Sequence, residues 1–124
     1  MRLSFQAIEN WQQHASDLSK ISSNLEPSQW QEWQQAAQLY SCTFNQRVVA
    51  YCVVSCNKQQ LLVQRFHVRD ITQRRGIGLF MFQQLLQLVA QKGLSQLTFP
   101  HSNDPAVLAF YQHLGLNNQF TFQL

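Results

Sequence analysis

The sequence predicts an α/β domain with a mixed central sheet and flanking helices, and two observations carry this prediction. Two β-rich runs, residues 38–44 and 47–55, are joined by the short turn Asn45-Gln46, which indicates an antiparallel hairpin. Further on, a strand-like run, a long amphipathic helix and a second strand follow one another, and this order favours a parallel pair. Antiparallel and parallel pairs in one chain predict a mixed sheet.

The first half of the chain supplies most of the expected strands. Residues 3–8 alternate between apolar and polar side chains and predict the first strand, whereas apolar residues recur at helical spacing within 9–24. Pro27 and Ser28 offer the start of a second helix. The hairpin comes next, and the strand-like run at 61–70 extends it to three antiparallel strands in series.

The second half changes its periodicity at Gly76. Apolar residues then recur every three or four positions up to the stop at Gly93, which predicts one amphipathic helix. Residues 95–100 form the next expected strand, and a short helix closed by Gly115 follows it. The remaining residues leave room for one terminal strand.

Composition limits the classes of protein. The chain has 124 residues, which predicts a single domain over 1–124. No apolar run approaches the ~20 residues that span a bilayer, and the N-terminal residues lack the apolar segment of a signal peptide, so we expect a cytoplasmic protein without membrane contact. The three cysteines lack CxxC spacing and are expected to be buried, reduced thiols rather than metal ligands.

The positive charge is local. Nine Lys and Arg against six Asp and Glu give a net charge of +3. Four of the nine lie within eleven residues, namely Arg65, Arg69, Arg74 and Arg75. Such clustering favours an anionic ligand at one site, and no nucleic-acid partner is expected because no basic stripe or recognition helix is evident.

The segment QRRGIG, residues 73–78, lies in this basic cluster and begins the long helix. Backbone N–H groups at a helix start are unpaired donors at the positive end of the helix dipole. A diphosphate can settle on them, and Gly76 and Gly78 let its oxygens approach closely. The spacing differs from the Walker loop and from GxGxxG. A tight helix start that binds no ligand is the alternative interpretation.

Two segments together resemble the GNAT N-acetyltransferase superfamily. QRRGIG is similar to its acetyl-CoA signature Q/R-x-x-G-x-G/A, and SNDPAVLAFYQHLGL is similar to its second block, with Leu116 in place of Phe. The resemblance covers roughly residues 39–116. It implies the GNAT fold, with a shortened C-terminus here, and acetyl-CoA as the cofactor.

The resemblance also implies roles for individual residues. The strand at Phe66, His67 and Val68 would hold the pantetheine arm through its backbone, and Asn103 would contact the same arm. The pyrophosphate would lie on Thr72, Gln73, Arg74, Arg75, Gly76, Ile77, Gly78 and Leu79. Tyr111 would lie near the thiol sulfur as general acid, in an enzyme that acetylates a small amine or a protein amino group. A helix tyrosine with its hydroxyl at the surface is the alternative for Tyr111.

The sequence departs from the GNAT enzymes in two places. Val63, Gln64 and Thr98 stand where many members supply a carboxylate base, and none of them can take a proton. His67 is a substitute base by its titration range, while a histidine in packing or solvent is the other interpretation. Only eight residues follow Leu116, so the acceptor side is expected to be open or shallow.

Both departures are typical of one branch, the PanZ (PanM) family. The segments LYSCTFNQRVVAYCVV and RFHVRDITQRRGIG resemble that branch. The resemblance implies an acetyl-CoA sensor that promotes self-cleavage of the aspartate 1-decarboxylase zymogen and so regulates pantothenate biosynthesis. Asn45 and Arg47 would face the partner, with an ordinary hairpin turn as the alternative. A sensor and an N-acetyltransferase both remain open at this point.

Overall fold

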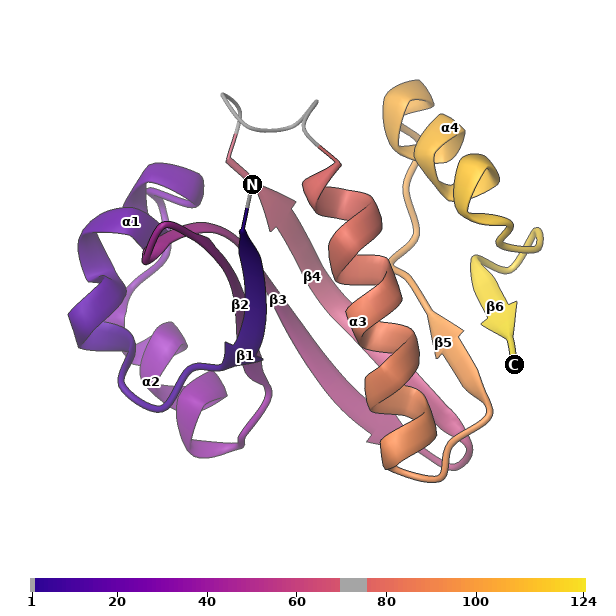
Figure 1. Ribbon diagram of the computed structural model, residues 1–124, viewed down its shortest axis with the longest axis horizontal. Coiled ribbons are helices and arrows are strands. Elements are labelled where there is room, and N and C mark those ends of the chain that lie inside the picture. Colours follow the sequence, from indigo (N-terminus) through magenta and orange to yellow (C-terminus); the bar gives the residue numbers. More distant parts are fainter. Residues whose placement is uncertain (1, 70–75) are drawn as a thin grey trace.

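One mixed sheet organises residues 2–69 and 76–124, which are the residues that the computed structural model describes (Figure 1). The strands lie side by side in chain order, and their bounds are β1 (Leu3–Ala7), β2 (Leu39–Phe44), β3 (Arg47–Asn57), β4 (Gln60–Val68), β5 (Gln96–Thr98) and β6 (Thr121–Gln123). Every neighbouring pair is antiparallel except β4 and β5. The predicted hairpin and the predicted parallel pair are therefore both confirmed.

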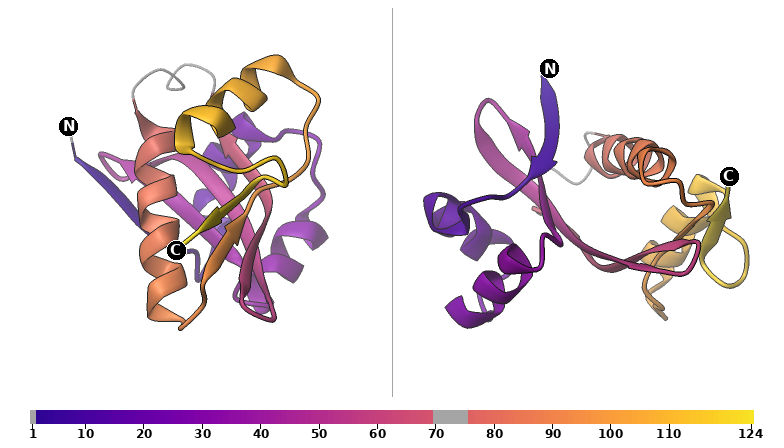
Figure 2. Two further views of the ribbon diagram at one scale, coloured as in Figure 1. Left: turned by 90° about the vertical axis from the view of Figure 1, so that its right-hand side faces the viewer. Right: turned by 90° about the horizontal axis from the view of Figure 1, so that it is seen from below.

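Helices cover both faces of this sheet. Their bounds are η1 (Trp11–His14), α1 (Ala15–Ile21), α2 (Pro27–Gln35), α3 (Ile77–Gln91) and α4 (Pro105–Leu114). Figure 2 shows α1 and α2 on one face and α3 on the other. The helical spacing within residues 9–24 yields a short 3₁₀ turn and then α1, and the turn begins where the Asn10 side chain accepts the Gln12 N–H at 3.2 Å.

Two apolar cores result from these layers. Between the sheet and α1 and α2, the side chains of Leu18, Trp30 and Trp33 are buried with Tyr51. On the other face, α3 packs Met81 and Leu85 onto the sheet, where α4 also contributes. Burying one such side chain stabilises the fold by about 1.5–3 kcal/mol. The two α2 tryptophans, Trp30 and Trp33, are thus part of a core.

The β2–β3 hairpin has a strained turn and a bulge. Asn45 and Gln46 both have positive φ, 52° and 69°, as the tight turns of hairpins require. Beyond the turn the register slips, so that Thr43 pairs with Val48 while Cys42 pairs with Ala50. A bulge of this kind leaves backbone groups without a partner in the neighbouring strand.

Asp17 of α1 compensates for this bulge. Its Oδ2 accepts the backbone N–H of Val48 at 3.0 Å, which ties the helix layer to the sheet. Asp17→Ala should lower the free energy of unfolding by about 1–3 kcal/mol, because an N–H group is left without its acceptor. Asp17→Asn keeps a carbonyl acceptor and should lose less. Equal losses in urea unfolding of the two variants would contradict this role.

Buried thiols predict a loss of stability at alkaline pH. Cys42 and Cys52 are buried and unbridged, and burial raises the pKa of the Cys42 thiol from 9.0 to about 11 and that of Cys52 still further. Because each folded-state pKa lies above the unfolded one, the unfolded chain loses its protons first. Stability is therefore complete below pH 9 and falls as the pH rises towards 11.

Melting temperatures between pH 8 and pH 11 measure this effect. Cys42→Ala should show a shallower decline than the parent chain, whatever its absolute stability. Cys56 is exposed, so the expectation that all three cysteines are buried is wrong for this one. Cys56→Ala therefore serves as the control and should keep the parent slope. The same slope in all three proteins would show that buried thiols do not cause the decline.

Candidate functional site

The parallel strands β4 and β5 diverge. Their pairing covers only Gln60–Leu62 against Gln96–Thr98, although β4 continues to Val68. Within the described residues, β5 therefore does not satisfy the backbone of the second half of β4. The divergence opens a notch between β4 and the loop that leads from β5 to α4.

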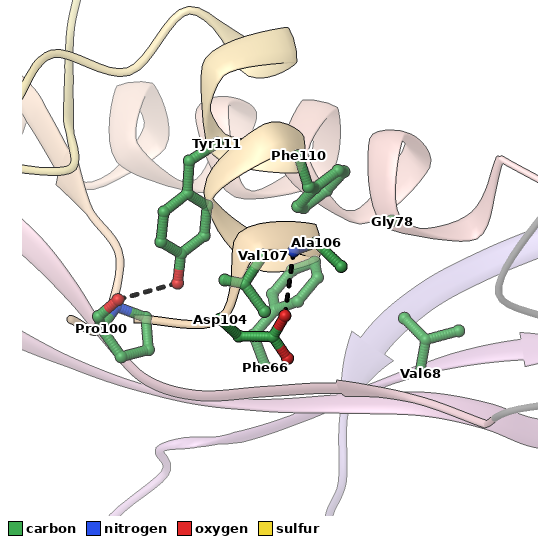
Figure 3. Close-up of a pocket in the computed structure, with 9 residues that line it drawn as sticks. All are labelled: Phe66, Val68, Gly78, Pro100, Asp104, Ala106, Val107, Phe110 and Tyr111. Carbon is green, nitrogen blue, oxygen red and sulfur yellow. Dashed lines mark hydrogen bonds between the residues drawn. The ribbon is translucent and has the colours of Figure 1, made fainter. Parts of the chain in front are cut away.

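A cavity of about 570 Å³ lies in this notch. Figure 3 shows the side chains of α4 on one side and those of β4 on the other. The lining residues are Phe66, Val68, Gly78, Pro100, Asp104, Ala106, Val107, Phe110 and Tyr111. Mostly apolar walls with a few polar groups are typical of sites that bind small molecules.

Gly76 and Gly78, at the start of α3, have different local roles. Gly76 has φ of +75°, which favours glycine, and a Cβ built on it would meet nothing within 4 Å. A Cβ on Gly78 would stand 3.0 Å from Cζ of Phe110. The first turn of a helix lacks intrahelical acceptors for its N–H groups, and α3 has no side-chain cap from the described residues. The backbone N–H donors of the first turn of α3 thus lie next to open space at Gly76. The missing side chain of Gly78 instead leaves room for Phe110 of α4 to pack against α3.

Only some of the other residues predicted to bind the cofactor line the cavity. Phe66 and Val68 line the cavity. Ile77 is buried in the core, and Leu79 is 40% exposed. Asn103 is exposed and is not among the lining residues, so its contact with the cofactor stays a prediction. Four predicted residues lie outside the described part of the chain, namely Thr72, Gln73, Arg74 and Arg75.

Tyr111 is buried against the cavity, with 7% of its surface exposed. Its hydroxyl donates a hydrogen bond of 2.8 Å to the backbone oxygen of Pro100 (Figure 3). Burial raises the pKa of this phenol above its ordinary value of 10.0, so the hydroxyl keeps its proton at neutral pH. The alternative of a hydroxyl at the surface is therefore wrong, and the proton is already engaged by a carbonyl.

His67 lies on the opposite face of β4 from the cavity. Its ring is 5.5 Å from that of Tyr51, a residue of the α1–α2 core, whereas the neighbouring Phe66 lines the cavity. Burial and the charge of Arg65 lower the pKa of His67. The imidazole is therefore neutral at neutral pH, which suits a base, but alternation along the strand turns it away from the cavity.

The three positions at which many GNAT members supply a carboxylate base contain no titratable side chain here. Val63 is buried, Gln64 is exposed and bonded to Ser55, and the hydroxyl of Thr98 lies 2.8 Å from that of Thr121. Among the described residues that line the cavity, the only carboxylate is that of Asp104.

Sequence reasoning missed Asp104, Val107 and Phe110. Asp104 caps α4 by accepting the Ala106 N–H at 2.9 Å, and this carboxylate ends at the cavity (Figure 3). A helix that begins after Asp104 places Val107 and Tyr111 four residues apart on one face. That spacing was available in the sequence, but the approach of Phe110 to Gly78 depends on how two helices pack.

The residues predicted to face a partner, Asn45 and Arg47, are not among those that line this cavity. Asn45 lines a second, polar cavity of about 490 Å³ together with Arg2 and His14. Arg47 is exposed at the start of β3. Their contact with a partner stays a prediction.

Two kinds of feature are absent from the described residues. None of the helices found there is long and apolar enough to cross a membrane. In the same part of the chain, no three His, Cys, Asp or Glu side chains are grouped so that they could hold a metal ion.

A mixed sheet whose parallel strands diverge beside a glycine-initiated helix defines the class of GNAT-fold proteins, and solved structures agree. Ard1 from Thermoplasma volcanium matches with a TM-score of 0.80 at 13% identity, over 94% of this chain and 84% of that one. PaiA N-acetyltransferase from Thermoplasma acidophilum, in complex with coenzyme A, matches with a TM-score of 0.72 at 8% identity over 100% of both chains. At such identities these likenesses establish the fold alone.

More specific matches identify the family. Residues 4–122 match the family model described as "Acetyltransferase (GNAT) domain, PanZ", and the chain therefore belongs to the PanZ family. The PanD regulatory factor of Escherichia coli K12 is 28% identical over 88 residues, which are 70% of this chain and 68% of that protein. The solution structure of YhhK from Escherichia coli, bound to coenzyme A, matches with a TM-score of 0.79 at 26% identity over 96% and 94% of the two chains.

Proposed function

We propose that this protein binds acetyl-CoA in the notch between β4 and α4 and, in that state, acts on the aspartate 1-decarboxylase zymogen as a maturation factor. The observation that carries the proposal is the cavity formed where β4 leaves β5, in a chain of the PanZ family. The coenzyme A complexes of YhhK and PaiA support a ligand of this type.

The cavity fits the parts of the cofactor. Between Val63 and His67, β4 does not pair with β5 in the described structure, so the backbone there can pair with the amides of an extended arm. Apolar side chains of Phe66 and Val107 can cover the methylene groups of that arm. At the start of α3, the first-turn N–H groups and the open space at Gly76 suit a pyrophosphate. Arg74 and Arg75 would add positive charge there.

The groups around the cavity favour sensing over catalysis. Bound acetyl-CoA would supply a thioester, whose transfer to an amine requires that the amine lose a proton and the leaving thiolate gain one. The Tyr111 proton is directed at Pro100, and the Asp104 carboxylate caps α4. His67 belongs to the other face of the strand. The described side chains at the cavity thus suit binding of the ligand, and their one carboxylate is already engaged as the cap of α4.

The PanD regulatory factor similarity supports the decarboxylase as the partner. Asn45 and Arg47 are our candidates for contacts with it, because they stand at the exposed hairpin end with a strained turn. Strained turns persist where the surrounding structure fixes them and often occur at functional sites.

Intact-mass analysis of the unprocessed decarboxylase from the same organism tests the proposal. The zymogen is incubated with this protein, with and without acetyl-CoA, and we expect two chains only when both are present. An intact zymogen under all conditions, with acetyl-CoA binding confirmed separately, would contradict the maturation role.

N-acetylation of a small amine or a protein amino group is the second candidate, and the burial of Tyr111 at the cavity is the observation that favours it. Tyr111→Phe separates the two functions. If Tyr111 is the general acid, turnover should fall by about 10²–10⁴-fold while acetyl-CoA affinity is retained. If the protein is a sensor, the variant should bind acetyl-CoA and support zymogen cleavage like the parent. Steady-state acetylation and cleavage assays on the same preparations distinguish these outcomes.

A further inference from the structure

Arg65 is held on the α1–α2 face of β4 by two aromatic residues. Its Nε donates to the hydroxyl of Tyr51 at 3.2 Å, and its Cζ lies 5.6 Å from the centre of the Trp33 ring. Tyr51 is fully buried, and its hydroxyl is fixed in turn by Ser22 Oγ at 2.8 Å. The guanidinium is therefore positioned before any ligand arrives.

Among the described residues, this guanidinium has no anionic partner. A guanidinium has five N–H donors, and the contacts of Arg65 in the described structure use one of them, on Nε. The Arg65 side chain is half-buried. The described carboxylates do not form an ion pair with it. The two terminal nitrogens keep the fork geometry that matches a carboxylate in bidentate fashion.

His67 adds a polar group beside Arg65. It lies two residues further along β4 on the same face, and its ring contacts Tyr51 as well. The cationic Arg65 helps to lower the pKa of His67, which keeps a second positive charge away from the fork. A neutral imidazole can donate one hydrogen bond to a ligand oxygen.

We infer that Arg65, oriented by Tyr51 and Trp33, forms a carboxylate-binding site on the face of β4 opposite the cofactor cavity. The ligand is a monocarboxylate, either a small organic acid or the terminal carboxylate of a polypeptide. This inference goes beyond the proposed function and does not rest on it, because it concerns different side chains on the other face of the sheet.

NMR of the full chain without acetyl-CoA tests the inference, through the Nε–H signal of Arg65. N-acetylglycine and its uncharged amide are titrated in parallel, followed by acetylated tetra-alanine with a free C-terminus and with an amide. We expect saturable shifts with the carboxylates and none with the amides. Saturation by both acids identifies a site for small acids, whereas saturation by the peptide alone identifies a polypeptide terminus.

Variants show whether Arg65 is responsible, with backbone amide shifts and the Trp33 indole signal as the readouts. Arg65→Gln should weaken carboxylate binding at least tenfold, and Arg65→Lys should bind with intermediate affinity, since lysine keeps the charge but not the fork. Lys92→Gln removes one exposed charge at the far end of α3 and should bind like the parent. Shifts that do not saturate, or equal binding by the Arg65 and Lys92 variants, would overturn the inference.

Discussion

Replacement of Gly78 by valine is expected to lower acetyl-CoA affinity by about tenfold to 100-fold and to leave the fold intact. A Cβ at this position would meet Phe110 at 3.0 Å, and both residues line the cavity. To avoid this collision the Phe110 ring must shift within the cavity, and acetyl-CoA must then displace it in order to bind. Overpacking of this kind costs about 1–3 kcal/mol, and each 1.4 kcal/mol changes affinity tenfold. Calorimetric titration with acetyl-CoA measures the effect.

Two further variants make this prediction specific. Ala90→Val also introduces a valine into α3, at an exposed position near the other end of the helix, and should not change the affinity. Phe110→Leu in a Gly78→Ala background should restore part of the affinity that Gly78→Ala alone loses, because the smaller side chain removes the collision. Unchanged affinity in a folded Gly78→Val protein would place acetyl-CoA elsewhere.

Leu85→Ala is expected to destabilise the protein by about 2–5 kcal/mol, the range for truncating a buried leucine. Leu85 is fully buried in the core beneath α3. The lost contacts fasten α3 to the sheet, and α3 carries Gly76 and Gly78 at its first turn. The variant should therefore show both a lower unfolding midpoint in urea and a weaker affinity for acetyl-CoA.

Leu88→Ala is the matched control on the same helix. Leu88 is only partly buried, so its truncation leaves a smaller cavity and should cost less. If both leucine variants lower the free energy of unfolding equally, the buried contacts of Leu85 are not what holds α3 on the sheet.

Local patterns in the sequence were sufficient for most of the fold. The hairpin turn at Asn45, the helix start at Gly76 and the strand after it each follow from neighbouring residues, and the structure confirms them. The family followed from two motifs in the right order. Four of the residues that line the cavity were predicted through that resemblance, namely Phe66, Val68, Gly78 and Tyr111.

Contacts between distant residues were not predictable in this way. Gly78 and Phe110 are far apart in the chain, and only the packing of α3 against α4 shows that one fills the space beside the other. The divergence of β4 from β5 begins after Leu62, and no residue type there marks it. The contacts of Arg65 with Tyr51 and Trp33 likewise depend on the packing of three elements, β4, β3 and α2.

Intermolecular NOEs between bound acetyl-CoA and the protein test the central claim most directly. We predict contacts from the pantetheine methylene and methyl protons to Val68, Val107 and the Phe110 ring, which line the notch between β4 and α4. NOEs confined to residues outside this cavity, or no binding of acetyl-CoA at all, would contradict the assignment of the site.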